Sequence, residues 1–191
     1  MQPINRPIRW GILGTGAIAA AFATALRQVT DVTLLAVGSR SQASADGFAQ
    51  IHNVDRAYAS YVELAADPDV DVVYIASPHT AHVENTMLCL GAGKHVLCEK
   101  PFALNSTQTE QMVALAKHNG LFLMEAMWMR FIPLIVELKR RIDAGDIGQV
   151  RMVQADFGFR APLNPNSRLF NPELAGGALL DLGVYPLAFS A

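Results

Sequence analysis

The sequence lacks a long apolar run, a basic block and a cysteine framework, and each absence excludes a class of protein. A membrane-spanning helix needs about 20 consecutive apolar residues, and no such run is present. The formal net charge is −2 and lysine and arginine do not cluster, so a nucleic-acid-binding surface is not indicated. Charged residues are only 17% of the chain and hydrophobic residues 51%, which argues against disorder and allows a sizeable core.

Cysteine is scarce as well. Cys89 falls in a helix-like pattern and Cys98 in a strand-like run, so we expect two buried thiols rather than a disulfide or a metal pair. Free thiols are typical of a reducing compartment. Residues 1–7 are polar and lack the apolar segment of a signal peptide. We therefore expect a cytoplasmic protein that does not bind a membrane.

Strand-like and helix-like patterns alternate through the first two thirds of the chain. Short apolar or β-branched runs predict strands, and longer runs without glycine or proline predict helices. An alternating series of this kind predicts a parallel, doubly wound α/β sheet of the Rossmann type, with right-handed crossovers. The expected strands are 8–13, 32–37, 57–59, 71–76, 95–98 and 121–124, and the expected helices are 17–29, 41–51, 61–66, 80–92 and 106–119, the last capped by Asn105.

The pattern changes after residue 124. An amphipathic helix is predicted at 133–144, a two-faced strand at 150–159, and a helix from residue 177 or 178 to 191. A lone strand cannot form a stable sheet. We therefore expect a Rossmann domain at 1–124, followed at 125–191 by the start of an α+β open-sheet domain that is truncated or completed by partner chains.

A dinucleotide-binding fingerprint follows the first predicted strand. Gly14-Thr15-Gly16-Ala17-Ile18-Ala19 has the form G-x-G-x-x-A and opens a helix. Gly14 permits the tight turn, Gly16 lets the backbone approach a pyrophosphate, and Ala17 and Ile18 offer free N–H groups at the helix N-terminus. An ordinary glycine turn is the alternative, but the strand–loop–helix–strand context favours cofactor binding.

The second predicted strand ends in Gly38-Ser39-Arg40. An NAD site usually carries an acidic residue here for the ribose 2′-hydroxyl, and this chain has none. Ser39 can donate to a 2′-phosphate, and Arg40 can pair with the phosphate and stack on adenine. We therefore expect NADP rather than NAD, although an ordinary solvated arginine would have the same sequence.

Further polar residues follow the later strands. Ser77, Pro78 and His82 come after the strand at 71–76, where the ribose and nicotinamide of a cofactor would pass. His79 and His82 could suggest a metal, but no carboxylate or thiol joins them at a suitable spacing, so no metal site is expected.

Three segments carry a resemblance to a known family. They are HVLCEKP at 95–101, EAMWMRF at 125–131 and GGALLDLGVYP at 176–186. In this order they resemble the glucose–fructose oxidoreductase/inositol dehydrogenase (Gfo/Idh/MocA) family, in the branch with dimeric dihydrodiol dehydrogenase and NADP-linked xylose dehydrogenase. The resemblance covers nearly the whole chain. It implies a Rossmann domain, an open-sheet domain and hydride transfer between NADP and a sugar, polyol or dihydrodiol.

The resemblance also implies roles for particular residues. It places Glu99 and Lys100 in the cofactor site, with Lys100 at the reacting oxygen. It makes Tyr185 the proton donor or acceptor and has Asp181 bind a second hydroxyl or orient the pair. From the residues alone, a solvated turn lysine, a helix-terminal aspartate and a core tyrosine are the alternatives. Asp181 and Tyr185 are four positions apart, which puts them on one face of a helix.

Three further expectations remain. Pro101 is a candidate for a cis peptide bond that would aim Lys100 into the cleft. Trp128, Arg130 and Phe131 either border that cleft or pack in the core, with core packing favoured for the aromatic residues. A homodimer or higher homo-oligomer is implied by the resemblance. The alternative function is a non-catalytic or truncated dinucleotide-binding protein of the same fold.

Overall fold

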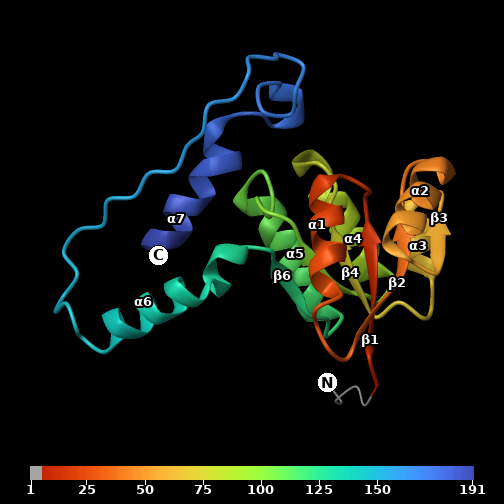
Figure 1. Ribbon diagram of the computed structural model, residues 1–191, viewed down its shortest axis with the longest axis horizontal. Helices are drawn as coiled ribbons and strands as arrows, with labels where there is room; N and C mark the ends of the chain where they lie inside the picture. Colours follow the sequence, from red (N-terminus) through yellow and green to blue (C-terminus); the bar gives the residue numbers. More distant parts are fainter. Residues whose placement is uncertain (1–5) are drawn as a thin grey trace. The chain divides into compact units, whose positions relative to one another are not determined.

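The computed structural model describes residues 6–191, in two compact units. The first unit ends at Glu125, and the second runs from Ala126 to Ala191. Each unit has its own set of elements (Figure 1).

The first unit is built on a six-stranded parallel sheet. Its strands lie in the order β3-β2-β1-β4-β5-β6, which is the order of a classical dinucleotide-binding fold. The predicted doubly wound α/β sheet is therefore confirmed. The strands are β1 (Ile8–Leu13), β2 (Val32–Gly38), β3 (Arg56–Tyr58), β4 (Val72–Ile75), β5 (His95–Cys98) and β6 (Leu123–Glu125).

Five helices connect these strands. Right-handed crossovers put α1 and α2 on one face of the sheet and α3, α4 and α5 on the other, and the contacts α1–α2, α3–α4 and α4–α5 agree with this arrangement. Side chains of Ser41, Ser60 and Asn105 cap α2, α3 and α5 by accepting backbone N–H groups. The helices are α1 (Ala17–Leu26), α2 (Gln42–His52), α3 (Tyr61–Ala66), α4 (His82–Gly91) and α5 (Ser106–His118).

The core lies between the sheet and these helices. Val73, Ile75 and Val96 are fully buried, as a parallel sheet covered on both faces requires. Cys89 and Cys98 are free and buried in the same cluster, and burial raises the pKa of each thiol to about 12. The expectation of two buried thiols is confirmed.

The register of the sheet brings the ends of five strands into one row. Gly38 pairs with Leu13, Leu13 with Ile75, Ile75 with Cys98, and Cys98 with Glu125. Each of these residues is the last of its strand, so the loops that follow them meet at the carboxyl edge of the sheet. Ligands of open α/β sheets bind at this edge.

Acidic residues that precede β4 are held by arginines. The Asp71 carboxylate lies 2.7 Å from Arg6 and 3.3 Å from Arg9. These guanidinium groups, that of Arg6 foremost, hold the pKa of Asp71 well below its usual range although burial opposes the shift. Nearby, the Tyr58 hydroxyl donates to Asp67 at 2.9 Å.

The second unit contains α6 (Pro133–Asp143), short 3-10 turns at Trp128–Phe131 and Pro172–Leu174, a π-helical segment (Leu179–Gly183) and α7 (Val184–Ser190). The helix predicted at 133–144 is confirmed. The strand predicted at 150–159 is wrong, because residues 149–164 have no regular secondary structure. Alternation favours a strand, but its N–H and C=O groups need a neighbouring strand, and the described part of this unit contains none. Within residues 6–191, no helix has both the length and the apolar character needed to cross a membrane.

Candidate active site

The loop after β1 begins with a turn that requires glycine. Gly14 has a φ of +104°, and its N–H donates to the Gly38 carbonyl at 2.9 Å. A Cβ atom here would lie 2.8 Å from the carbonyl oxygen of Ala76, too close for a real side chain. The absence of a side chain at Gly14 therefore lets β1, β2 and β4 end beside one another.

Gly16 offers open space rather than a tight turn. It is the N-cap residue of α1, with an extended backbone at φ −79° and ψ −179°. A Cβ atom added here would have no atom within 4 Å, and no side-chain hydrogen bond caps this end of the helix in the described chain. A side chain at residue 16 would therefore extend into open space at this end of α1, where the N–H groups of the first turn, those of Ala17 and Ile18 among them, are located. This arrangement fits a pyrophosphate.

The loop after β2 lies against residues 14–19, the predicted phosphate loop. Ser39 is buried, its N–H donates to the Tyr58 carbonyl at 3.0 Å, and its hydroxyl is 3.4 Å from that of Thr15. Arg40 is exposed. A hydroxyl beside the phosphate loop and an exposed guanidinium next to it can together hold a 2′-phosphate. Assignment of the two residues to the cofactor stays a prediction.

The loop after β4 is joined to the loop after β5 by a buried histidine. The Nδ1 atom of His82 is 2.8 Å from the Pro101 carbonyl oxygen, and its Nε2 atom is 3.0 Å from the Ser77 carbonyl oxygen. Burial lowers the pKa of His82, and the Lys100 charge acts in the same direction against the two carbonyls. Asn85 donates to the Ser77 hydroxyl at 3.0 Å, while Pro78 at the same bend is exposed. His82 thus joins the backbones of the two loops, and its part in cofactor binding stays a prediction.

The turn after β5 carries the predicted catalytic lysine. Glu99 is buried and accepts the Lys100 N–H at 3.1 Å, and it also accepts the Tyr74 hydroxyl. Burial raises the pKa of Glu99, and the hydrogen bond from Tyr74 opposes the shift. The peptide bond between Lys100 and Pro101, a candidate for the cis form from the sequence, is cis. Lys100 itself is half-buried at the carboxyl edge of the sheet.

Asp181 and Tyr185 both lie near the C-terminus of the second unit. Asp181 is buried in the π-helical segment, and its carboxylate is 3.1 Å from Arg168. Tyr185 is in α7, and its hydroxyl oxygen accepts the indole N–H of Trp128 at 3.1 Å. π-Helical turns are rare in proteins, and those that occur are often found at functional sites. Lys100 belongs to the first unit, so its approach to these two residues stays a prediction.

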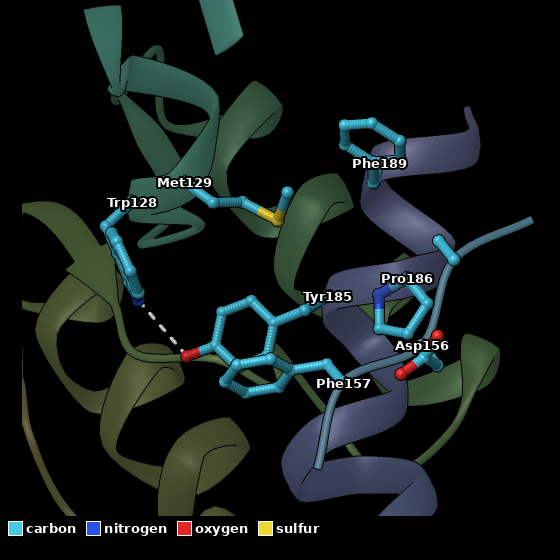
Figure 2. A pocket seen from close by; sticks show the side chains of 8 residues that line it. Trp128, Met129, Asp156, Phe157, Tyr185, Pro186 and Phe189 are labelled. Atoms are coloured by element: carbon cyan, nitrogen blue, oxygen red, sulfur yellow. Dashed lines mark hydrogen bonds between the residues drawn. The ribbon is translucent and has the colours of Figure 1, made fainter. Parts of the chain in front are cut away.

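A pocket of about 330 Å³ opens beside Tyr185 (Figure 2). The Phe157 ring packs edge-on against Tyr185, with 5.1 Å between ring centroids, and the Trp128 ring does so at 5.9 Å. Trp128 and Phe131 are 56% and 63% exposed, so the favoured expectation that they pack in the core is wrong for this unit. The lining is largely apolar and consists of Trp128, Met129, Ala155, Asp156, Phe157, Tyr185, Pro186 and Phe189.

Several partners of the site have little or no signal in the sequence. Phe157 lies in the segment predicted as a strand, and nothing in the pattern points to Arg168. Tyr74 lies in the apolar run of the strand predicted at 71–76. Its hydroxyl was the available signal, because a buried tyrosine O–H usually requires a partner.

No group of three or more histidine, cysteine, aspartate or glutamate side chains is placed to hold a metal ion in residues 6–191. The rings of His79 and His82 are 5.7 Å apart and meet edge to face.

Two family models match the chain. Residues 8–127 match the Gfo/Idh/MocA oxidoreductase family, NAD-binding Rossmann fold, and residues 135–190 match the C-terminal domain of the same family. Together they cover both compact units.

Curated relatives agree with these matches. The chain is 44% identical over 183 residues to trans-1,2-dihydrobenzene-1,2-diol dehydrogenase of Xenopus laevis, covering 95% of this chain and 55% of the relative. It is 44% identical over 204 residues to D-xylose 1-dehydrogenase (NADP(+)) of Hypocrea jecorina, covering 95% and 52%. The chain thus spans about half the length of the curated relatives it matches.

Solved structures share the fold. An NAD binding oxidoreductase from Klebsiella pneumoniae superposes with a TM-score of 0.84 at 33% identity, over 96% of this chain and 52% of that one. A 3-ketoreductase variant from Actinomadura kijaniata, solved with TDP-benzene and NADP, gives a TM-score of 0.82 at 31% identity, over 95% and 56%.

Proposed function

The chain belongs to the Gfo/Idh/MocA family of oxidoreductases, and we propose that it binds NADP for hydride transfer to or from a CH–OH group. The substrate class we propose is a sugar, a polyol or a dihydrodiol. The observation that carries the proposal is the phosphate loop. Gly14 closes a turn that no other residue fits, and Gly16 leaves open space at the N-terminus of α1.

The preference for NADP rests on the end of β2. An acidic side chain at this point would accept the ribose 2′-hydroxyl of NAD and repel a 2′-phosphate. Here the residues are Ser39, whose hydroxyl is beside Thr15, and the exposed Arg40. A guanidinium can pair with two phosphate oxygens at once. The D-xylose dehydrogenase relative carries NADP(+) in its name, which supports the same choice.

Proton handling falls to side chains of the chain itself. A bound nicotinamide supplies the hydride acceptor or donor. In this assignment Lys100 forms a hydrogen bond with the reacting oxygen of the substrate. Tyr185 donates or accepts the proton. Asp181 binds a neighbouring hydroxyl of the substrate. The indole N–H of Trp128 donates to the Tyr185 oxygen at 3.1 Å, which leaves the tyrosine O–H to point elsewhere, toward an acceptor.

The setting of the protein is part of the proposal. Two buried free thiols are typical of proteins in a reducing compartment, and we propose the cytoplasm.

We also propose a homodimer or a higher homo-oligomer, by resemblance to the family. Sedimentation analysis of the purified protein measures that state directly, and a monomer at all concentrations would contradict it.

The test of the function has two stages. In the first, NADPH and NADH are titrated against the protein by nicotinamide fluorescence, and we expect the dissociation constant for NADPH to be at least about tenfold lower. In the second, NADP reduction is measured with a panel of pentoses, hexoses, polyols and dihydrodiols. Absence of binding to either cofactor would refute the proposal. Binding without turnover on any panel member would favour the non-catalytic alternative.

A further inference from the structure

A buried tyrosine lies directly behind the Lys100 turn. Tyr74 is in the middle of the sheet, in β4, and is 2% exposed. Its hydroxyl donates to a carboxylate oxygen of Glu99, which is 9% exposed. A buried carboxylate needs hydrogen-bond donors, because water no longer supplies them. Tyr74 is one such donor for Glu99.

Glu99 in turn holds the backbone of the turn. Its other carboxylate oxygen accepts the Lys100 N–H at 3.1 Å. Two residues further on, the N–H of Phe102 donates to Glu125, at the end of β6, at 2.9 Å. The turn that carries Lys100 is therefore anchored by one carboxylate at each end.

The ring of Tyr74 is itself positioned by the phosphate-binding helix. Phe22, in α1, stacks on Tyr74 with 3.9 Å between ring centroids and 17° between ring planes. Phe22 also contacts Trp10 of β1, with 5.3 Å between ring centroids and the ring planes tilted by 57°. Any shift of α1 relative to the sheet thus changes the contact between Phe22 and Tyr74. The N-terminus of this helix is the end that faces the predicted pyrophosphate.

We propose that Tyr74 is a positioning residue that connects the phosphate-binding helix α1 to the Lys100 turn, through Phe22 on one side and Glu99 on the other. The role of Lys100 in this inference rests on the proposed function. The connection itself is a property of the first unit. A phenylalanine in place of Tyr74 would preserve the ring stack but remove the donor to Glu99, and the Lys100 N–H would lose a fixed acceptor.

The test is amide hydrogen exchange measured by NMR on the whole chain. In Tyr74→Phe we expect the exchange rate of the Lys100 amide to rise at least about fivefold relative to the amide of Val96 in β5. Referring the rate to Val96 separates a local effect from a general loss of stability. Phe22→Leu, which removes the stacked ring and leaves every hydroxyl in place, should accelerate exchange at Lys100 in the same way. Phe22→Leu also tests the proposal if Tyr74→Phe does not fold.

Tyr58→Phe is the matched control. It also deletes a tyrosine hydroxyl that donates to a carboxylate, in this case that of Asp67. Tyr58 is in β3, and β2, β1 and β4 separate it from β5. We expect the ratio of exchange rates at Lys100 and Val96 to stay within twofold of the unsubstituted protein.

Two outcomes would overturn the inference. One is a Lys100 exchange rate, relative to Val96, that is unchanged in Tyr74→Phe or in Phe22→Leu. The other is an equal acceleration in Tyr58→Phe. Failure of the proposed function has a different signature, because it would show as absent NADPH binding in the unsubstituted protein while the exchange results stood.

Discussion

Replacing Gly16 by alanine is the sharpest perturbation of the phosphate loop. The structure separates the two glycines of this loop by what a Cβ atom would meet. At Gly14 it would collide with the Ala76 carbonyl, so a substitution there damages the fold as well as the site. At Gly16 it would meet no atom within 4 Å, and φ is −79°, which any residue adopts. Gly16→Ala therefore changes the space for a ligand and little else.

The size of the effect follows from the hydrogen bonds at risk. A hydrogen bond between a backbone N–H and a phosphate oxygen is charge-assisted and contributes about 1.5–3 kcal/mol. If the added methyl group displaces the pyrophosphate from one such donor, NADPH affinity falls about ten- to hundredfold. The free energy of unfolding is expected to fall by less than about 1 kcal/mol, because the one cost to the fold is that alanine is a poorer N-cap residue than glycine.

The assay is a fluorescence titration with NADPH, combined with urea unfolding of the same samples. Gly47→Ala is the matched control, because Gly47 is exposed in α2 and a Cβ atom there also meets nothing within 4 Å. In a helix interior this exchange should stabilise the protein by about 0.5–1 kcal/mol. NADPH affinity should not change. Equal NADPH affinities in Gly16→Ala and Gly47→Ala would refute the assignment of the loop to the pyrophosphate.

Three further predictions concern separate parts of the chain. Arg40→Ala should weaken NADPH binding at least about tenfold and NADH binding less than twofold, and equal losses in parallel titrations would contradict the 2′-phosphate assignment. Lys100→Ala should lower turnover at least about hundredfold in steady-state kinetics with NADPH affinity nearly unchanged, and normal turnover would remove Lys100 from the catalytic set. Asp71→Asn should lower the free energy of unfolding at pH 7. The pKa of Asp71 is lowered in the folded state, so its ionised form stabilises the protein at pH values above the unfolded pKa of about 3.9. The difference in free energy of unfolding between the unsubstituted protein and Asp71→Asn should therefore shrink as pH falls from about 5 to 2. A constant difference across that range in urea unfolding would contradict the ion-pair argument.

The strands and helices of the first unit could be predicted from the sequence because each is marked by residues within it or directly before it. Each strand is a short apolar run, such as Val72–Ile75, and Ser41 and Asn105 cap the helices they precede. The helix after β4 was expected from residue 80 but begins at His82, since residues 79–81 form a 3-10 turn. Capping and periodicity act within a few residues, so they determine which elements exist better than where they end.

The second unit depends on contacts between parts of the chain that are far apart in sequence. The alternation at 150–159 is real, but a strand depends on a partner that the described residues of this unit do not provide. The aromatic residues Trp128 and Phe157 meet Tyr185 across 57 and 28 positions of the chain. Contacts over such distances in sequence leave no periodic pattern, so the pocket they form is visible only in three dimensions.

By itself the sequence determined the parallel sheet, the glycine loop, the buried thiols and the basic rather than acidic residue after β2, because each depends on the chemistry of a few neighbouring residues. Only the tertiary structure decided that His82 bridges two carbonyls, that Tyr74 supports Glu99 and that Trp128 donates to Tyr185. These interactions join groups from different elements, and the packing of those elements sets the distance between the groups. A donor and an acceptor far apart in the chain acquire a defined partner only when the fold brings them within hydrogen-bonding distance.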